Sequence, residues 1–258
     1  MGRIIAIANQ KGGVGKTTTT LNLAVELHNR GFRVLCVDFD HQANLSDYLG
    51  HEPDGGYTIT HLMTAAVQNP AALAELIPAT IRQSAEGVYY IPADINFSTA
   101  EMFLAQAMFR ERALHTILSN PAMPEFDYIL IDCLPSLGIL LTNALIASDS
   151  LIIPVQAQKF ALNGMDALLS VCELVRMQAN AGLEVEGILL TMAENTTMSR
   201  YVEGELRKRF GDLVIKSVIR RSVEAANSSA MQRSLVNMRS KLGQQYIKAV
   251  DELLERGV

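Results

Sequence analysis

Two patterns of hydrophobic and polar positions alternate along the chain. Short apolar runs typical of buried strands occupy residues 3–8, 33–37, 87–91, 128–131, 150–155, 185–191 and 213–219. Apolar residues at helical spacing fill most of the intervening segments, over residues 17–29, 45–49, 59–66, 70–77, 98–117, 198–210 and 238–256 and in a run ending near residue 178. This alternation predicts an α/β fold, a doubly wound and mostly parallel sheet with helices on both faces. A chain of 258 residues fits one such domain, residues 1–258.

Two of the helical runs carry apolar stripes that we expect to pack in the core. In residues 98–117 the stripe consists of Met102, Phe103, Ala107, Phe109, Leu114 and Ile117. In residues 238–256 the apolar face, which we predict packs on the sheet, consists of Leu242, Tyr246, Ala249, Leu253 and Leu254.

Composition indicates an ordinary globular protein. Apolar residues make up 49% of the chain, yet no charge-free apolar stretch reaches the length of a membrane span. The first residues predict a strand rather than a signal peptide, so we expect a cytoplasmic protein. Cys36, Cys133 and Cys172 lie far apart without metal-like spacing, which favours reduced thiols in the core.

The net charge of −5 conceals an uneven distribution. Residues 1–199 carry 10 lysines and arginines against 20 acidic residues, whereas residues 200–248 carry 11 against four. A basic segment on an otherwise acidic protein is a candidate surface for a phosphate backbone. Each of these side chains alone is more simply a solvated charge, but together they form a set of candidate DNA contacts: Arg200, Arg207, Lys208, Arg209, Arg220, Arg221, Arg233 and Arg239.

The segment 9–18, Asn-Gln-Lys-Gly-Gly-Val-Gly-Lys-Thr-Thr, lies between an apolar run and an amphipathic run. This order predicts a strand, a phosphate-binding loop and a helix. Glycines let the backbone N–H groups approach an anion, and the dipole of the following helix adds to the attraction. Lys16 would reach the β- and γ-phosphates, and the Thr17 hydroxyl would bind a bridging Mg²⁺. The residues predicted to bind the nucleotide are Lys11, Gly12, Gly13, Val14, Gly15, Lys16, Thr17 and Thr18.

This loop departs from the ordinary phosphate-loop pattern, because Gln10 stands where a glycine is expected and a second lysine, Lys11, follows it. The run from residue 11 to residue 18 resembles the deviant Walker A loop of the ParA/MinD/nitrogenase-iron-protein superfamily. In that family the extra lysine reaches across a dimer interface to the partner's nucleotide. The resemblance therefore implies an ATP-dependent sandwich dimer, in which Lys11 and Lys16 both serve catalysis; otherwise Lys11 is a solvated loop charge.

Two acidic motifs follow at the ends of predicted strands. Asp38 and Asp40 lie where parallel strands usually present ligands, and the run 37–44 resembles the family's second signature. The resemblance implies that Asp40 positions the attacking water and that Asp38 supports the Mg²⁺ site; either acid could instead cap the next helix. His41 and Ala43 replace the proline and glycine usual in that signature.

Asp132 ends the apolar run 128–131 and has the form of a Walker B acid, which holds Mg²⁺. It could alternatively serve only as a turn former. The family usually has proline where this chain has Leu134.

The resemblance covers two further segments. The run 156–164 resembles a family segment at the dimer interface, although Lys159 could equally be a solvated charge. After the strand 185–191, Met192 stands where family members place groups near the adenine, while Glu194 replaces a more usual aspartate.

Along nearly its full length the chain is similar to ParA partition ATPases. The resemblance implies a slow ATPase that uses ATP and Mg²⁺, dimerises with ATP, binds DNA non-specifically and is stimulated by a ParB-like centromere-binding protein. It would partition a plasmid, chromosome or other cargo from the cytoplasm, and associate with the nucleoid when ATP is bound. The alternatives are a membrane-cycling ATPase like MinD, disfavoured by the net acidic segment 249–258, and a reductase or ligase of the same fold. No Asn-Lys-x-Asp segment is present, which disfavours GTP.

Overall fold

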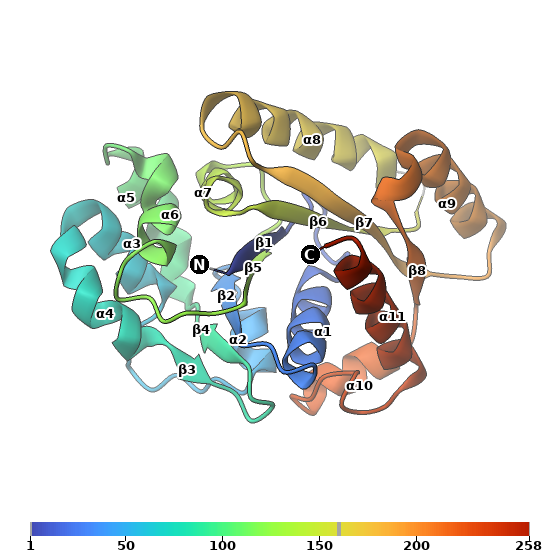
Figure 1. The fold of residues 1–258 in the computed structure, drawn as a ribbon, viewed down its shortest axis with the longest axis horizontal. Coiled ribbons are helices and arrows are strands. Elements are labelled where there is room, and N and C mark those ends of the chain that lie inside the picture. Colours follow the sequence, from blue (N-terminus) through green and yellow to red (C-terminus); the bar gives the residue numbers. More distant parts are fainter. Residues whose placement is uncertain (1, 159–160, 258) are drawn as a thin grey trace.

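The centre of the protein is a mixed sheet, seen in a computed structural model that describes residues 2–158 and 161–257 (Figure 1). Within these ranges eight strands lie in the order β3-β4-β2-β5-β1-β6-β7-β8. Their bounds are β1 Arg3–Ile7, β2 Val34–Phe39, β3 Arg82–Gln83, β4 Tyr89–Ile91, β5 Tyr128–Cys133, β6 Ser150–Gln156, β7 Glu184–Ala193 and β8 Val214–Arg220. All neighbouring strands are parallel except β3 and β4. The predicted fold class is confirmed, and β3 is an addition that the sequence pattern did not indicate.

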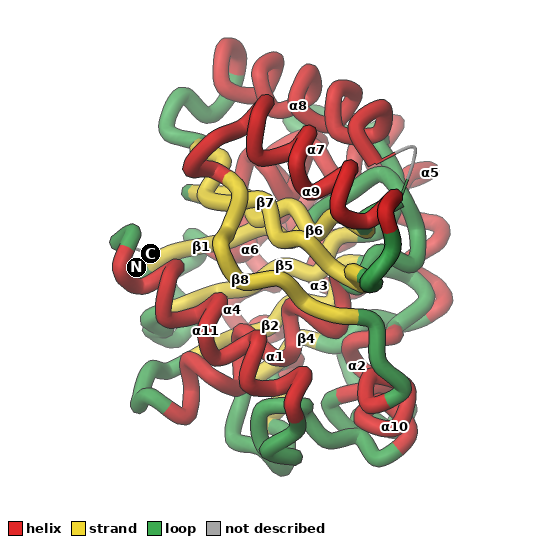
Figure 2. Tube along the Cα trace, turned by 90° about the vertical axis from the view of Figure 1, so that its right-hand side faces the viewer, coloured by secondary structure: helices red, strands yellow, loops and turns green. Residues whose placement is uncertain are grey.

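Helices cover both faces of the sheet, as Figure 2 shows with α7 and α8 on one side of the strands and α1 and α11 on the other. One face carries α3 Ile59–Gln68, α4 Leu73–Thr80, α5 Ala100–Ala105, α6 Ala113–Leu118, α7 Ile139–Ala147, α8 Ala161–Gln178 and α9 Thr197–Phe210. The other carries α1 Lys16–Asn29, α2 Asn44–Tyr48, α10 Glu224–Ala230 and α11 Lys241–Glu255. Short 3-10 turns lie at Pro70–Ala72, Ile95–Thr99, Arg110–Arg112 and Gly211–Leu213.

The period of two along each strand produces two separate hydrophobic cores. In β1, Ile4 and Ala6 point to the core under α3 and α7, while Ile5 and Ile7 point to the core under α1 and α11. Because both faces are covered, the central strands are buried along nearly their whole length, as is usual for parallel sheets. This explains why they read in the sequence as uninterrupted apolar runs.

The prediction for residues 98–117 is partly wrong. The segment is broken into α5, a 3-10 turn and α6. The helix α5 ends at Ala105, and Phe109, just before the 3-10 turn, takes a left-handed backbone conformation with φ 54° that prevents one continuous helix. Met102 and Phe109 are therefore 72% and 74% exposed, whereas Leu114 and Ile117 are buried as expected. The helix α7 was also not predicted.

The C-terminal helix behaves as its pattern predicted. Leu242, Tyr246, Ala249 and Leu253 are buried, and α11 packs against α1 as well as the edge strand β8. The Tyr246 hydroxyl lies 3.3 Å from the hydroxyl of Thr19 in α1. The apolar face of α11 is thus occupied inside the fold.

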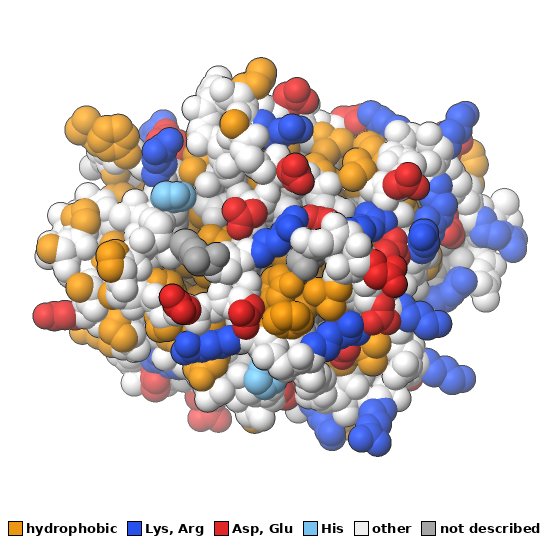
Figure 3. All heavy atoms as spheres, viewed as in Figure 1, with side chains coloured by type: hydrophobic (Ala, Val, Ile, Leu, Met, Phe, Trp, Pro, Cys, Tyr) orange, Lys and Arg blue, Asp and Glu red, His pale blue; other side chains and the backbone are white. Residues whose placement is uncertain are grey.

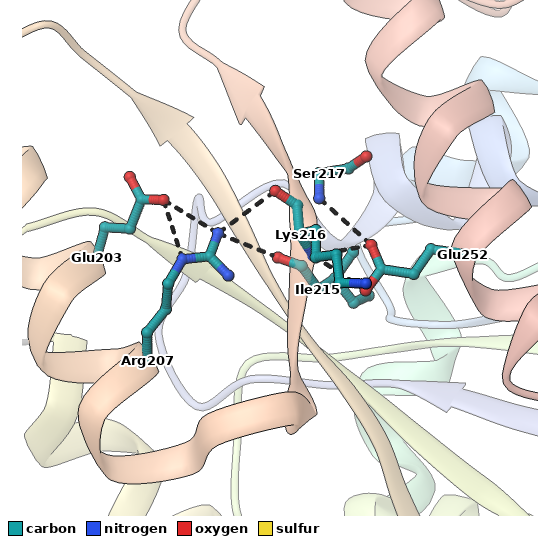
Figure 4. A network of polar contacts seen from close by, with 6 residues as sticks. All are labelled: Glu203, Arg207, Ile215, Lys216, Ser217 and Glu252. Carbon is teal, nitrogen blue, oxygen red and sulfur yellow. Dashed lines mark hydrogen bonds and ion pairs between the residues drawn. The ribbon is translucent and has the colours of Figure 1, made fainter.

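Edge strand β8 bulges where it pairs with β7, and two charged side chains bind the backbone groups of the bulge (Figure 4). Glu252 of α11 accepts hydrogen bonds from the N–H groups of Lys216 (2.8 Å) and Ser217 (3.4 Å). Arg207 of α9 donates to the carbonyls of Ile215 and Lys216 at 3.4 and 3.3 Å. We call these two side chains the β8 clamp, because they supply partners that a bulged ladder lacks.

Candidate nucleotide site

The loop after β1 lies at the carboxyl end of a central strand, since β1 is flanked by β5 and β6. Gly13 and Gly15 have left-handed φ values of 69° and 86°, which only glycine adopts without strain. A Cβ placed on Gly12 or Gly13 would meet no heavy atom within 4 Å. The loop therefore presents backbone to open space, as a phosphate-binding loop requires.

Side chains that the sequence did not single out anchor this loop to the neighbouring strands. The Asn9 amide donates to the carbonyl of Pro154 in β6 at 2.7 Å, and its oxygen accepts from the Lys11 N–H at 3.0 Å. The Thr191 hydroxyl of β7 donates to the carbonyl of Val14 at 2.8 Å. Met192, predicted near the adenine, has a left-handed φ of 50° and its methyl group lies 3.8 Å from the Cβ position of Gly15.

Lys16 begins helix α1 and is buried. Burial lowers the pKa of Lys16, while the nearby Asp132 acts in the opposite direction. Within the described residues it has no ion pair at contact distance. A buried cation without a paired anion is favourably placed to bind a phosphate ligand.

Asp38 and Asp132 lie side by side, because β2 and β5 pair in a register that sets them opposite each other. Burial, reinforced by Asp38, raises the pKa of Asp132 to about 8, although the Thr17 hydroxyl and Lys16 counteract it. Thr20 also contacts Asp132, at 3.3 Å. Two buried carboxylates beside the Thr17 hydroxyl form an oxygen-rich set that fits Mg²⁺. No cluster of three or more His, Cys, Asp or Glu side chains suited to a metal occurs in the described chain, so phosphate oxygens would have to complete the coordination.

Asp38 has a second attachment that bears on its predicted metal role. One carboxylate oxygen accepts hydrogen bonds from the Ser46 N–H (2.8 Å) and hydroxyl (2.6 Å), and Ser46 in turn accepts from the N–H of Ala93 at 2.9 Å. Burial raises the pKa of Asp38 to about 6, against the effect of these bonds. Asp38 thus binds the first turn of α2, as a helix-capping acid would, while it lies opposite Asp132 in the sheet.

Asp40 lies at the turn between β2 and α2. Its carboxylate accepts from the Gln42 N–H at 3.0 Å, and the His41 ring is 3.6 Å away. Ala43 has a φ of 53°, in the region where the family's usual glycine is free of strain. The replacement of that glycine therefore costs about 1–2 kcal/mol, but the turn is kept.

Lys11 is exposed, in contrast to Lys16. Its ammonium donates to the side-chain oxygens of Gln156 at 3.0 Å and Gln158 at 2.8 Å, both at the end of β6. Lys159, the other predicted interface lysine, lies outside the described residues. The three cysteines are free and buried, as predicted.

In Figure 3 lysine and arginine side chains gather along the right-hand side of the molecule. The candidate DNA contacts lie on α9, at the end of β8 and in the segment that follows α10. Several already have partners. Arg207 pairs with Glu203 and binds the β8 backbone, Arg209 pairs with Asp166, and Arg221 pairs with Glu194. The remaining members have no ion pair within the part of the chain that is described: Arg200, Lys208, Arg220, Arg233 and Arg239.

Fold and site together define a P-loop nucleotide-binding protein with two lysines in its phosphate loop. A family model described as AAA domain matches residues 2–185. The sporulation initiation inhibitor protein Soj of Bacillus subtilis is 39% identical over 264 residues, covering 100% of both chains. The chromosome partitioning protein ParA of Myxococcus xanthus is 37% identical and covers 99% of this chain and 89% of its own. The chain belongs to the ParA/Soj family of partition ATPases, as its motifs predicted.

A solved structure with the same fold carries ligands. Cobyrinic acid a,c-diamide synthase from Mycobacterium smegmatis, with bound ATP analog and magnesium, matches with a TM-score of 0.82 and 32% identity. The match covers 99% of this chain and 95% of that one. The predicted cofactors, ATP and Mg²⁺, agree with the ligands of that structure.

Proposed function

We propose that the chain is an ATPase that dimerises on binding ATP, grips DNA without reading its sequence and partitions a plasmid, chromosome or other large cargo. One observation carries the proposal: the phosphate loop holds a buried lysine, Lys16, and an exposed lysine, Lys11. The first is placed for the chain's own nucleotide. The second lies on the surface, where a partner subunit's nucleotide could meet it.

The residues of the site have distinct roles in this scheme. Loop N–H groups and Lys16 bind the phosphates, and Thr17 with Asp132 holds Mg²⁺, which neutralises charge on the transferred phosphoryl group. Asp40 orients the attacking water. Catalysis here is positioning and charge stabilisation without a covalent intermediate, so we expect slow turnover that a ParB-like partner stimulates.

The test of the dimer is size-exclusion chromatography with light scattering, in ATP and in ADP, on the wild type and on Asp40→Ala. We expect monomers in ADP and a persistent dimer of Asp40→Ala in ATP, because that variant cannot hydrolyse the nucleotide that holds the subunits together. Monomers of Asp40→Ala in saturating ATP would contradict the proposal.

DNA binding is supported by the basic edge over α9, β8 and α10. Basic groups from two subunits neutralise more phosphates, so affinity should be higher in ATP than in ADP and fall steeply with salt. Fluorescence anisotropy with two unrelated duplexes of equal length measures this. Equal affinity in both nucleotides, or preference for one duplex, would argue against the proposal.

Two alternatives make different predictions. A membrane-cycling ATPase like MinD needs a free amphipathic helix, whereas the apolar face of α11 is buried in the fold; no described helix could span a membrane. ATP-dependent sedimentation with anionic liposomes would favour that alternative. A ligase of the same fold would turn over ATP only with an organic acid substrate.

A further inference from the structure

The ammonium group of Lys11 has an intramolecular resting place. It donates to two acceptors, the side-chain amide oxygens of Gln156 and Gln158, at 3.0 and 2.8 Å. Both acceptors are neutral, so Lys11 is held here without a compensating negative charge.

Strands β6 and β7 anchor both the phosphate loop and the two glutamines. Gln156 ends β6 in register with Thr191 of β7, whose hydroxyl binds the loop carbonyl of Val14. The Gln158 N–H donates to the Gln156 carbonyl at 2.7 Å, which fixes the turn that presents both amides. The backbone N–H of Lys11 is itself held by Asn9, which is bound to β6. The position of Lys11 therefore follows from the geometry of β6 and β7 rather than from free rotation of a surface side chain.

We propose that Gln156 and Gln158 are positioning residues for Lys11, which hold it within its own subunit and thereby set the protein concentration at which the ATP-bound dimer forms. The inference rests on the proposed function, in which Lys11 serves the partner's nucleotide. A lysine bound by its own subunit must be released before it can cross the interface. The triphosphate of the partner offers several negative charges, and it therefore replaces two neutral amides favourably.

In each dimer, glutamine amides and the partner's triphosphate compete for Lys11 at two places, because the lysine of each subunit must be released. Loss of one exposed hydrogen bond changes an equilibrium by about two- to tenfold. Two released lysines multiply this effect, so one substitution per subunit changes the dimer dissociation constant by about four- to hundredfold.

The neutrality of the amides predicts opposite effects for two substitutions at one position. In Gln158→Ala, Lys11 loses an acceptor and is released more easily, so the dimer should form at lower protein concentration. In Gln158→Glu, an ion pair holds Lys11 more firmly, so the dimer should form at higher concentration. A merely structural role of Gln158 would weaken the dimer in both variants.

Sedimentation velocity in a saturating non-hydrolysable ATP analogue with Mg²⁺ measures the dimer dissociation constant of the wild type, Gln158→Ala and Gln158→Glu. Gln178→Glu, at the exposed far end of α8, makes the same charge change away from the loop and serves as the matched control. We expect at least about a fourfold decrease for Gln158→Ala, at least about a fourfold increase for Gln158→Glu and no change for the control. Shifts of both Gln158 variants in one direction, or no shift, would overturn the inference.

Repeating the measurement in a Lys11→Ala background separates the two proposals. If the wild type dimerises and Lys11→Ala does not, the proposed function stands, and only the Gln158 shifts decide on the inference. If Lys11→Ala dimerises like the wild type, the role of Lys11 in the proposed function fails. Monomer affinity for ADP and the melting temperature report whether any variant has lost its fold.

Discussion

Buried acidic side chains occur at the carboxyl edge of the sheet and at the β8 clamp, and the two places differ in the partners that these side chains have. At the carboxyl edge, Asp132 and Asp38 face each other, and burial raises the pKa of both carboxyl groups, to about 8 and about 6. At the β8 clamp, the buried Glu252 accepts hydrogen bonds from two backbone N–H groups and from the guanidinium of Arg256. Within the described residues neither aspartate has an ion pair at contact distance, and Lys16 offsets the raised pKa of Asp132 only in part, whereas Glu252 is fully partnered.

This difference distinguishes a ligand-binding site from a contact that only stabilises the fold. Carboxylates held together in a low-dielectric environment destabilise the nucleotide-free protein, and a bound cation relieves that cost. A carboxylate surrounded by donors stabilises the fold whether or not a nucleotide is bound. The contrast explains why both ends carry buried acids although only one end carries the nucleotide motifs.

Among the variants of these buried acids, Asp132→Asn should change the stability of the nucleotide-free protein most. A carboxyl group whose pKa is raised in the folded state contributes stability that is present at low pH and is lost as pH rises toward 8. We therefore expect the nucleotide-free variant to exceed the wild type at pH 8.5 by more than about 1.4 kcal/mol in the free energy of unfolding, the equivalent of one pKa unit. The advantage should shrink at pH 5.5. Urea denaturation at the two pH values measures it.

Adding Mg²⁺-ATP should reverse that order, because the asparagine cannot supply the negative charge that a divalent cation needs. If the free energy of unfolding changed with pH equally in the wild type and the variant, Asp132 would not be the group that destabilises the protein at high pH.

Glu252→Gln should lower the stability of the nucleotide-free protein, whereas Asp132→Asn should raise it. The amide keeps one acceptor but opposes the N–H groups of Lys216 and Ser217 with its own donor, so we expect a loss of about 1–3 kcal/mol at both pH values. Nucleotide affinity should stay unchanged. Arg207→Ala should cost less, about 1 kcal/mol, because its bonds to β8 are long and its partner Glu203 is half-exposed. A weaker nucleotide affinity in either variant would contradict the claim that the β8 clamp stabilises the fold without contributing to the nucleotide site.

The smallest expected effect distinguishes arginines within the basic edge. Arg200→Ala should lower the slope of log affinity for DNA against log salt by about one, since Arg200 has no ion pair in the described structure. Arg207→Ala should leave the slope unchanged, because that guanidinium is bound to Glu203 and the β8 backbone. Anisotropy titrations at four salt concentrations measure the slopes. A larger change for Arg207 than for Arg200 would contradict this assignment.

Local sequence pattern predicted the elements whose signal lies within one continuous segment. The apolar runs of β1 and β5, the glycines of the phosphate loop and the stripe of α11 are each complete within one segment. The interruption of the helix near Phe109 could not be predicted, because a phenylalanine with positive φ has no local sequence signal. The apolar spacing of residues 98–117 therefore indicates one helix where the structure has α5 and α6.

The contacts missed in the site are those between different elements of the fold. Thr191 holds Val14 across 177 positions of sequence and Gln158 holds Lys11 across 147, while Ser46 of α2 holds Asp38 of β2. Serine, threonine and glutamine are common polar residues, and only the folded sheet brings these particular ones to the loop. The motifs therefore predict the groups that would act on the nucleotide, but not the groups that position them.

The central claim is that Lys11 joins two subunits through their nucleotides. Its most direct test compares Lys11→Ala with the wild type in mass photometry with ATP and in steady-state phosphate release. We predict that the variant stays monomeric in ATP, loses turnover and still binds ADP like the wild type. Self-association and turnover equal to the wild type would contradict the claim and leave only a nucleotide-binding monomer with a solvated surface lysine.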